Sequence, residues 1–192
     1  MTNRHILLLL VPWLAASLAL GASGVLTGLK PPVPQIILFS ITVALIVAIG
    51  TIPPLRRWAF TVDVRWLVGF HLTRFVGFYF LYLYMQNVLP FEFAVIGGIG
   101  DIVVAASAVV LLQTVSPHSP WGKWLYLGWN LVGLIDIFMV VITAGATALI
   151  NPRSMEALQR LPLCLLILFV VPIIIATHFV MIVRLLRRPS GG

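Results

Sequence analysis

Long apolar runs, separated by short polar or proline-containing segments, organise this chain. A helix needs about 20 mostly apolar residues to span a bilayer, and six runs come close to that length or exceed it. They cover residues 5–29, 34–52, 66–89, 91–113, 121–150 and 161–186. Lys30, Pro53 and Pro90 lie where one run gives way to the next. The pattern predicts an all-α integral membrane protein, a single domain over residues 1–192 built as a bundle of six transmembrane helices.

Composition supports the same class and narrows the function. Hydrophobic residues make up 61% of the chain and charged residues 9%, whereas a soluble domain is about 45–50% apolar and about 25% charged. A soluble globular domain is therefore excluded. The loops between the runs are short, which leaves little room for a soluble active site or binding domain. We expect a protein that is not an enzyme.

Lysine and arginine predict the orientation, because basic residues gather on the cytoplasmic side of membrane helices. With six spans, one side carries eight of the eleven flanking basic residues and the other carries Lys30, Arg153 and Arg160. The eight are Arg4, Arg56, Arg57, Arg65, Lys123, Arg184, Arg187 and Arg188. Both termini are expected in the cytoplasm, in a multi-pass protein of the inner (plasma) membrane. The net charge of +7 is explained by these positions and by lipid headgroups, and we expect no nucleic-acid partner.

Two other features bear on processing and redox chemistry. The first run, with Arg4 before it and small residues near Ala22, has some features of a cleaved signal peptide. It is long for one, so we favour a retained helix. The single cysteine, Cys164, has no partner in the chain, which excludes a disulfide framework and a cysteine metal site.

Four polar residues interrupt the apolar runs, at Arg74, Asp101, Asn130 and Asp136. A charge in hydrocarbon costs a few kcal/mol or more, so such residues mark a pathway, a site or an internal tie. With a rise of about 1.5 Å per residue, Arg74, Asp101 and Asn130 lie at similar depth, and Asp136 lies one or two turns further out. Small residues at Ala94, Gly98, Ala105 and Ala108 place Asp101 on a helix–helix face.

Two interpretations of this layer stay open. In the first, Arg74 pairs with Asp101 and Asn130 completes the hydrogen bonds, so that the layer ties the helices together. In the second, the layer lines a cavity or a route for a proton or solute, with Asp136 at its outer end. The sequence does not distinguish them, because a transporter also needs its charges neutralised.

The histidines His71 and His178 lie within the third and sixth runs at similar depth. Two histidines at one depth on different helices have the arrangement that ligates a b-type haem from both faces. The competing interpretation is ordinary hydrogen bonding between helices. No cysteine or carboxylate accompanies the two histidines at that depth, so we expect no zinc or other metal site. No cofactor is expected, with haem b as the one candidate.

These observations predict a small transport, permeation or accessory membrane protein of unknown substrate. The alternatives are a b-type haem protein for electron transfer or sensing, and a structural subunit of a membrane complex. The expected partners are the lipid bilayer and either another membrane protein or further copies of the chain.

Overall fold

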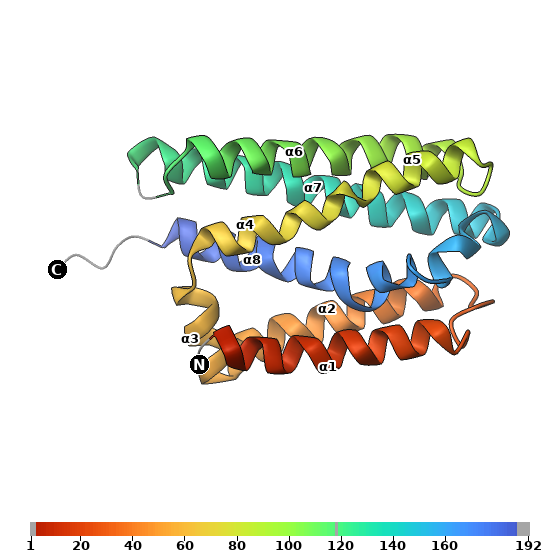
Figure 1. Cartoon of the computed structure of the whole chain (residues 1–192), viewed down its shortest axis with the longest axis horizontal. Coiled ribbons are helices and arrows are strands. Elements are labelled where there is room, and N and C mark those ends of the chain that lie inside the picture. The colour runs from red at the N-terminus through yellow and green to blue at the C-terminus, as the bar shows by residue number, and fades with distance from the viewer. Residues whose placement is uncertain (1–2, 118, 188–192) are drawn as a thin grey trace.

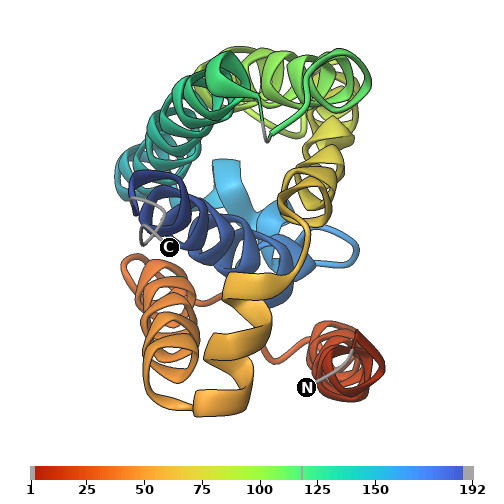
Figure 2. The ribbon, with the colours of Figure 1, turned by 90° about the vertical axis from the view of Figure 1, so that its left-hand side faces the viewer.

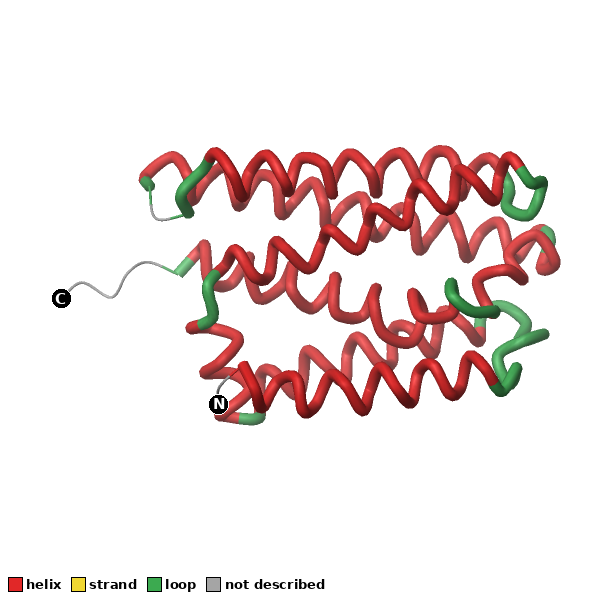
Figure 3. The backbone as a smooth tube through the Cα atoms, in the orientation of Figure 1, coloured by secondary structure: helices red, strands yellow, loops and turns green. Residues whose placement is uncertain are grey.

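Helices account for all the regular structure in the described part of the chain, which a computed structural model gives for residues 3–117 and 119–187 (Figure 1). The polar segments between the helices lie at the two ends of the bundle (Figure 3). Six helical stretches are long and apolar enough to cross a membrane: Arg4–Ala22, Val33–Thr51, Val64–Met85, Glu92–Thr114, Trp121–Ile150 and Leu166–Leu186. At this level the predicted all-α architecture with six long apolar helices is confirmed.

The chain forms α-helices, labelled α, and 3₁₀- or π-helices, labelled η. They are α1 (Asn3–Ala22), α2 (Val33–Thr51), α3 (Pro53–Thr61), α4 (Val64–Phe70), η1 (His71–Val76), α5 (Gly77–Met85), η2 (Glu92–Gly97), α6 (Gly98–Thr114), α7 (Pro120–Ile150), η3 (Pro152–Gln159), η4 (Leu166–Val170) and α8 (Val171–Leu186).

Three predicted helix ends are wrong, and one of them is the end of the third run, where the helix stops at Met85 rather than near residue 89. The first helix ends at Ala22 rather than near residue 29, and turns follow it. Gly24 and Gly28 have positive φ angles of 72° and 86°, a backbone conformation that glycine adopts readily and that a helix cannot continue through. The sixth helical stretch begins a few residues later than expected, because residues 161–163 form a turn.

The segment 53–65, expected to be a polar loop, contains the short helix α3. Pro53 and Pro54 occupy its first two positions, where a missing N–H costs nothing. Arg184, near the end of α8, donates from Nη1 to the backbone oxygens of Ala59 and Val62 at 3.2 and 2.6 Å. This contact holds α3 against the end of α8. Arg188, one of the eight basic residues that predict the orientation, lies outside the described residues, and so does His118.

Viewed from the end, α4 to α8 surround a common centre, with α1, α2 and α3 to one side (Figure 2). The last long helix is the most enclosed: 61% of the most apolar stretch in Leu166–Leu186 is buried, compared with 11% for α1 and α2. Aliphatic side chains on the outer faces are exposed instead, as at Leu8, Val11, Val132 and Ile142. An apolar exterior around a buried polar interior suits a bilayer as solvent.

The third long helical stretch is irregular at its middle. Its α-helical parts, α4 and α5, are joined by the 3₁₀-helix η1 (His71–Val76). A 3₁₀ segment inside a longer helix often marks strain or a functional position. This one carries His71 and Arg74, both fully or almost fully buried.

Candidate functional site

Arg74 is the centre of the buried polar residues. Its side chain is 1% exposed, and each of its three guanidinium nitrogens donates a hydrogen bond. Nε donates to Oδ1 of Asp101 on α6 at 2.6 Å, Nη1 donates to the backbone oxygen of Gly133 on α7 at 3.0 Å, and Nη2 donates to Oδ2 of Asp136. One arginine therefore joins η1 to both α6 and α7.

Glycines allow the helices to come this close. A Cβ at Gly77 would collide with the backbone oxygen of Gly98, and a Cβ at Gly98 would lie 3.0 Å from the oxygen of Gly77. A Cβ at Gly100 would likewise collide with the carboxylate of Asp136. The small residues expected to form a stripe along the fourth long helical stretch (η2 and α6) are buried, with Ala94 and Ala105 both 0% exposed. Because these small residues allow the helix backbones to lie close together, the side chain of Arg74 can reach Asp101.

Asp136 belongs to the same group of charges as Arg74 and Asp101. It does not lie apart from them at the outer end of a route, as one interpretation of the sequence expected. The guanidinium reaches both carboxylates because an arginine side chain is long and its donors diverge. Asp101 is 4% exposed in its side chain and Asp136 is 22% exposed. We call Arg74, Asp101 and Asp136 the charged triad. With all three ionised it carries one negative charge more than positive.

The two histidines lie in direct contact, with ring centroids 4.3 Å apart and ring planes at 60°. Both are 0% exposed. His71 Nε2 lies 3.1 Å from the hydroxyl of Thr177 on α8, and the ring of Trp129 packs edge-on against His71 at 5.1 Å between centroids. We call His71 and His178 the histidine pair.

The structure corrects the expected role of Asn130. Its amide does not complete the hydrogen bonds of Arg74 and Asp101. It pairs instead with His178, through Oδ1 to Nδ1 at 2.8 Å and through Nδ2 to the backbone oxygen at 3.1 Å. Asn130 and Asp136 point in different directions around α7, so the depth of a residue alone did not identify its partner. The charged triad, the histidine pair and Asn130 together form the polar layer.

The present arrangement of the histidine pair does not hold a haem between the rings. Iron–nitrogen bonds of about 2 Å place ligating nitrogens about 4 Å apart across the ring, and ring centroids lie further apart still. A centroid separation of 4.3 Å leaves no space for a macrocycle. Haem ligation would need the side chains to separate, and haem b stays a prediction. Among the described residues no group of three or more His, Cys, Asp or Glu side chains could hold a metal ion.

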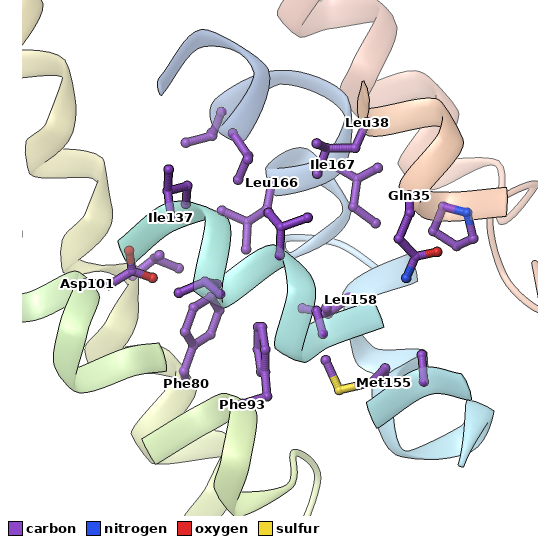
Figure 4. A pocket seen from close by; sticks show the side chains of 18 of the residues that line it. Gln35, Leu38, Phe80, Phe93, Asp101, Ile137, Met155, Leu158, Leu166 and Ile167 are labelled. Carbon is purple, nitrogen blue, oxygen red and sulfur yellow. The ribbon is translucent and has the colours of Figure 1, made fainter. Parts of the chain in front are cut away.

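A mostly apolar cavity leads to the charged triad (Figure 4). Gln35 lies toward one side of it and Asp101 toward the other, with Ile137, Phe80 and Leu166 among the apolar side chains between them. Arg74 and Thr73 also line it. The centres of water molecules fit within about 80 Å³ of this space, which is room for several waters. The cavity therefore has room for a small polar molecule beside Arg74 and Asp101.

On the other side of the polar layer, toward the ends where α1 begins and α8 ends, the core is apolar. Val68, Ala108, Tyr126 and Met181 are 0% exposed there and pack in one hydrophobic cluster. The lining of the cavity extends from the layer toward the end of the bundle that carries Pro31, Pro34 and Pro152.

Sequence reasoning did not assign a role to Gly133, Thr177 or Gln35. Gly133 accepts from Arg74, and a Cβ there would lie 2.9 Å from Cε1 of His178. Its position one turn before Asp136 was a usable signal. Thr177 precedes His178 in an apolar run and gave none. Gln35 was recognisable only as a lone amide near the start of an apolar helix.

Comparison with known proteins identifies a family but no activity. Residues 31–186 match the family described as a domain of unknown function, DUF8737. The matched region contains the whole polar layer and the residues that line the cavity. No curated protein and no protein of solved structure matches the chain.

Proposed function

The chain belongs to the DUF8737 family, and we propose that it is a multi-pass membrane protein that admits a small solute into the cavity ending at Arg74 and Asp101. The observation that supports this is the position of two ionisable side chains, Arg74 and Asp101, in the cavity wall. A purely internal tie needs no access from outside. A transport or permeation protein needs such access to its buried charges.

The proposed membrane is the inner (plasma) membrane, with the end that carries Arg56, Arg65 and Lys123 in the cytoplasm. Arg184 and Arg187 end α8 on the same side. At the opposite end, Lys30 lies shortly before α2, Arg153 lies in η3, and Arg160 directly follows η3. The excess of basic residues at one end is the bias expected of a cytoplasmic face. The cavity then approaches the polar layer from the outside.

The composition of the cavity wall suits a small molecule with an apolar body and a polar group. Aliphatic and aromatic side chains form most of the wall, and the polar side chains that line it are few: Gln35, Thr73 and Gln159, together with Arg74 and Asp101 of the charged triad. Ligand sites in proteins commonly combine an apolar lining with a few polar groups that orient the ligand. The apolar cluster around Tyr126 and Met181 closes the route beyond the layer. Passage through the protein requires that cluster to open.

Thiol accessibility tests the proposal. Cys164 is the sole cysteine and is buried, so Cys164→Ser provides a background without thiols. Ala144→Cys in this background places a thiol in the cavity wall, since Ala144 lines it. Ile142→Cys is the matched control, because Ile142 lies close by on α7 and its side chain is 59% exposed on the outer face.

In intact cells, a charged thiol reagent that cannot cross membranes should label Ala144→Cys and leave Ile142→Cys unlabelled. The same contrast should appear with Ile137→Cys, which is deeper in the cavity, at a lower rate. If Ala144→Cys is as unreactive as Ile142→Cys, water does not reach the cavity from outside. That result would contradict the proposal and favour a structural subunit held together by the charged triad.

A further inference from the structure

The charged triad lacks one positive charge. Arg74 neutralises one of the two carboxylates that it bonds, Asp101 and Asp136. Arg74 is also the sole lysine or arginine within the middle of any long helix. An unbalanced charge in the apolar interior is costly. A bound cation would supply the missing charge, and the smallest such cation is a proton.

The hydrogen bonds of His178 define which of its ring nitrogens carries hydrogen. Asn130 donates from Nδ2 to the backbone oxygen of His178, and that oxygen can only accept. The amide is thereby oriented with Oδ1 toward Nδ1 of His178, 2.8 Å away. Since Oδ1 can only accept, Nδ1 carries the hydrogen. In the neutral ring Nε2 then has a free lone pair.

The same reasoning applies to His71. The hydroxyl of Thr177 donates to the backbone oxygen of Ile174 at 2.8 Å, so its single hydrogen is in use. The hydroxyl oxygen must accept from Nε2 of His71, 3.1 Å away. In the neutral ring Nδ1 of His71 has the free lone pair.

These two lone pairs are buried and unused. Nδ1 of His71 and Nε2 of His178 have no hydrogen-bond partner among residues 3–117 and 119–187, and both side chains are 0% exposed. Buried polar atoms in folded proteins are nearly always hydrogen-bonded, so two free basic nitrogens in contact need an explanation. A role as proton acceptors provides one.

Gly133 brings the triad and the histidine pair together. Its backbone oxygen accepts from Arg74, and a Cβ on it would lie 2.9 Å from Cε1 and 3.4 Å from Nε2 of His178. The unused nitrogen of His178 therefore faces the residue that Arg74 bonds. The titratable and polar groups of the polar layer around Gly133 come from four elements. They are His71 and Arg74 from η1, Asp101 from α6, Asn130 and Asp136 from α7, and His178 from α8.

We propose that the polar layer binds one exchangeable proton, which rests on a carboxyl group of the charged triad and can be transferred to the free lone pairs of the histidine pair. A neutral carboxylic acid beside one Arg–carboxylate pair leaves the layer without net charge. In the transfer the acid's O–H bond breaks and leaves its electrons on oxygen. An N–H bond forms at Nε2 of His178 or Nδ1 of His71, and that imidazole becomes an imidazolium.

This inference deepens the proposed function and rests on it for the route by which the proton arrives. The cavity reaches Asp101 and has room for water, so protons enter from the end that the cavity approaches. The histidine pair lies on the far side of the triad, next to the apolar cluster that closes the bundle. A proton that moves from the triad to the histidine pair has advanced along the same path as the proposed solute.

Infrared spectroscopy of the purified full-length protein at neutral pH tests whether the polar layer holds one exchangeable proton. The wild type should show the carbonyl stretch of one protonated carboxylic acid, sensitive to exchange into D₂O. Asp136→Asn removes the surplus charge and keeps the pair of Arg74 and Asp101, so this band should be lost. Glu92→Gln is the matched control: it removes a carboxyl group at the start of η2, outside the layer, and should retain the band. Asp101→Asn provides a second variant with one carboxylate for one arginine.

Nitrogen-15 NMR of the histidine rings tests which ring nitrogens carry hydrogen and which are free to accept a proton. The variants His71→Gln and His178→Gln assign the signals. In the neutral rings, His178 should carry its hydrogen on Nδ1 and His71 on Nε2. An imidazolium in the wild type with both carboxylates ionised would also support the proposal, with the proton at its second position. Reversed ring protonation would remove the free lone pairs and overturn the transfer.

The proposal of one bound proton is overturned if, in the wild-type protein at neutral pH, both carboxylates of the charged triad are ionised and both rings of the histidine pair are neutral. This failure differs from a failure of the proposed function, which thiol labelling of Ala144→Cys measures independently. A titrating layer behind an unreactive cavity would contradict access from outside. A reactive cavity with no protonated group would contradict the proton site alone.

Discussion

Asn130 holds His178 through two hydrogen bonds at once, one to the ring and one to the backbone, across the interface of α7 and α8. Both residues are 0% exposed. The backbone contact orients the amide, and the oriented amide sets the hydrogen position on the imidazole. A single side chain thus determines both the packing of two helices and the chemistry of a buried base.

Replacing Asn130 with leucine should destabilise the protein. The change roughly keeps the volume, leaves Nδ1 of His178 without its partner, and removes a second hydrogen bond to the backbone oxygen of His178, which lies within α8. Each unsatisfied buried group costs about 1–3 kcal/mol. Thr177→Val removes the hydrogen bond between the hydroxyl and His71 together with a local one to the backbone oxygen of Ile174 in the same helical stretch, and should cost less. Thermal unfolding in detergent measures both. Equal melting temperatures for Asn130→Leu and the wild type would show that the double hydrogen bond does not contribute.

Arg74→Gln should be the most damaging single change in the layer, since it leaves two carboxylates with no cation. Breaking a buried ion pair costs about 3–5 kcal/mol. Asp101→Asn should cost less, because Asp136 still balances the arginine. The triple variant Arg74→Gln, Asp101→Asn, Asp136→Asn should recover part of the loss seen for Arg74→Gln. Unfolding free energies that simply add across these variants would mean that the three residues do not interact.

Gly77→Ala should lower the melting temperature, because the new Cβ would collide with the backbone of Gly98 and push α5 away from α6. Gly128→Ala is the matched control. Gly128 lies within α7 with nothing within 4 Å of an added Cβ, so alanine should stabilise by up to about 1 kcal/mol through helix propensity. A Gly77→Ala protein as stable as the wild type would show that the close helix approach is not needed.

Protein purified after expression with ample haem should show no Soret band, because the rings of His71 and His178 touch. A Soret band would be the opposite outcome. If His178→Ala then abolished the band and His118→Ala left it unchanged, the histidine pair would have separated to ligate haem b.

Reporters fused to either terminus should be active in the cytoplasm, given the eight basic residues on that side. A reporter inserted near Pro152 should be active outside. A reporter at Pro152 that works only in the cytoplasm would reverse the proposed orientation, and the cavity would then approach from within the cell.

The amino-acid sequence by itself determined the six long helices. It also identified the polar residues within them whose burial costs free energy. Apolar runs of this length are long enough to span a bilayer, and this depends on composition along the chain rather than on neighbours. The pairing of Arg74 with Asp101 also followed from depth, since opposite charges at one depth attract across any shared interface. Depth likewise brought His71 and His178 to one level.

Only the tertiary structure decided which polar groups bond. Asn130 lies at the depth of Arg74 but faces His178, and Asp136, expected further out, bonds Arg74 directly. The 3₁₀ turn at His71–Val76 and the glycine contact between Gly77 and Gly98 rotate and shift these helices against one another. A hydrophobic pattern specifies how deep a residue lies, whereas its partners depend on helix rotation and neighbour choice, which arise from packing of the whole bundle.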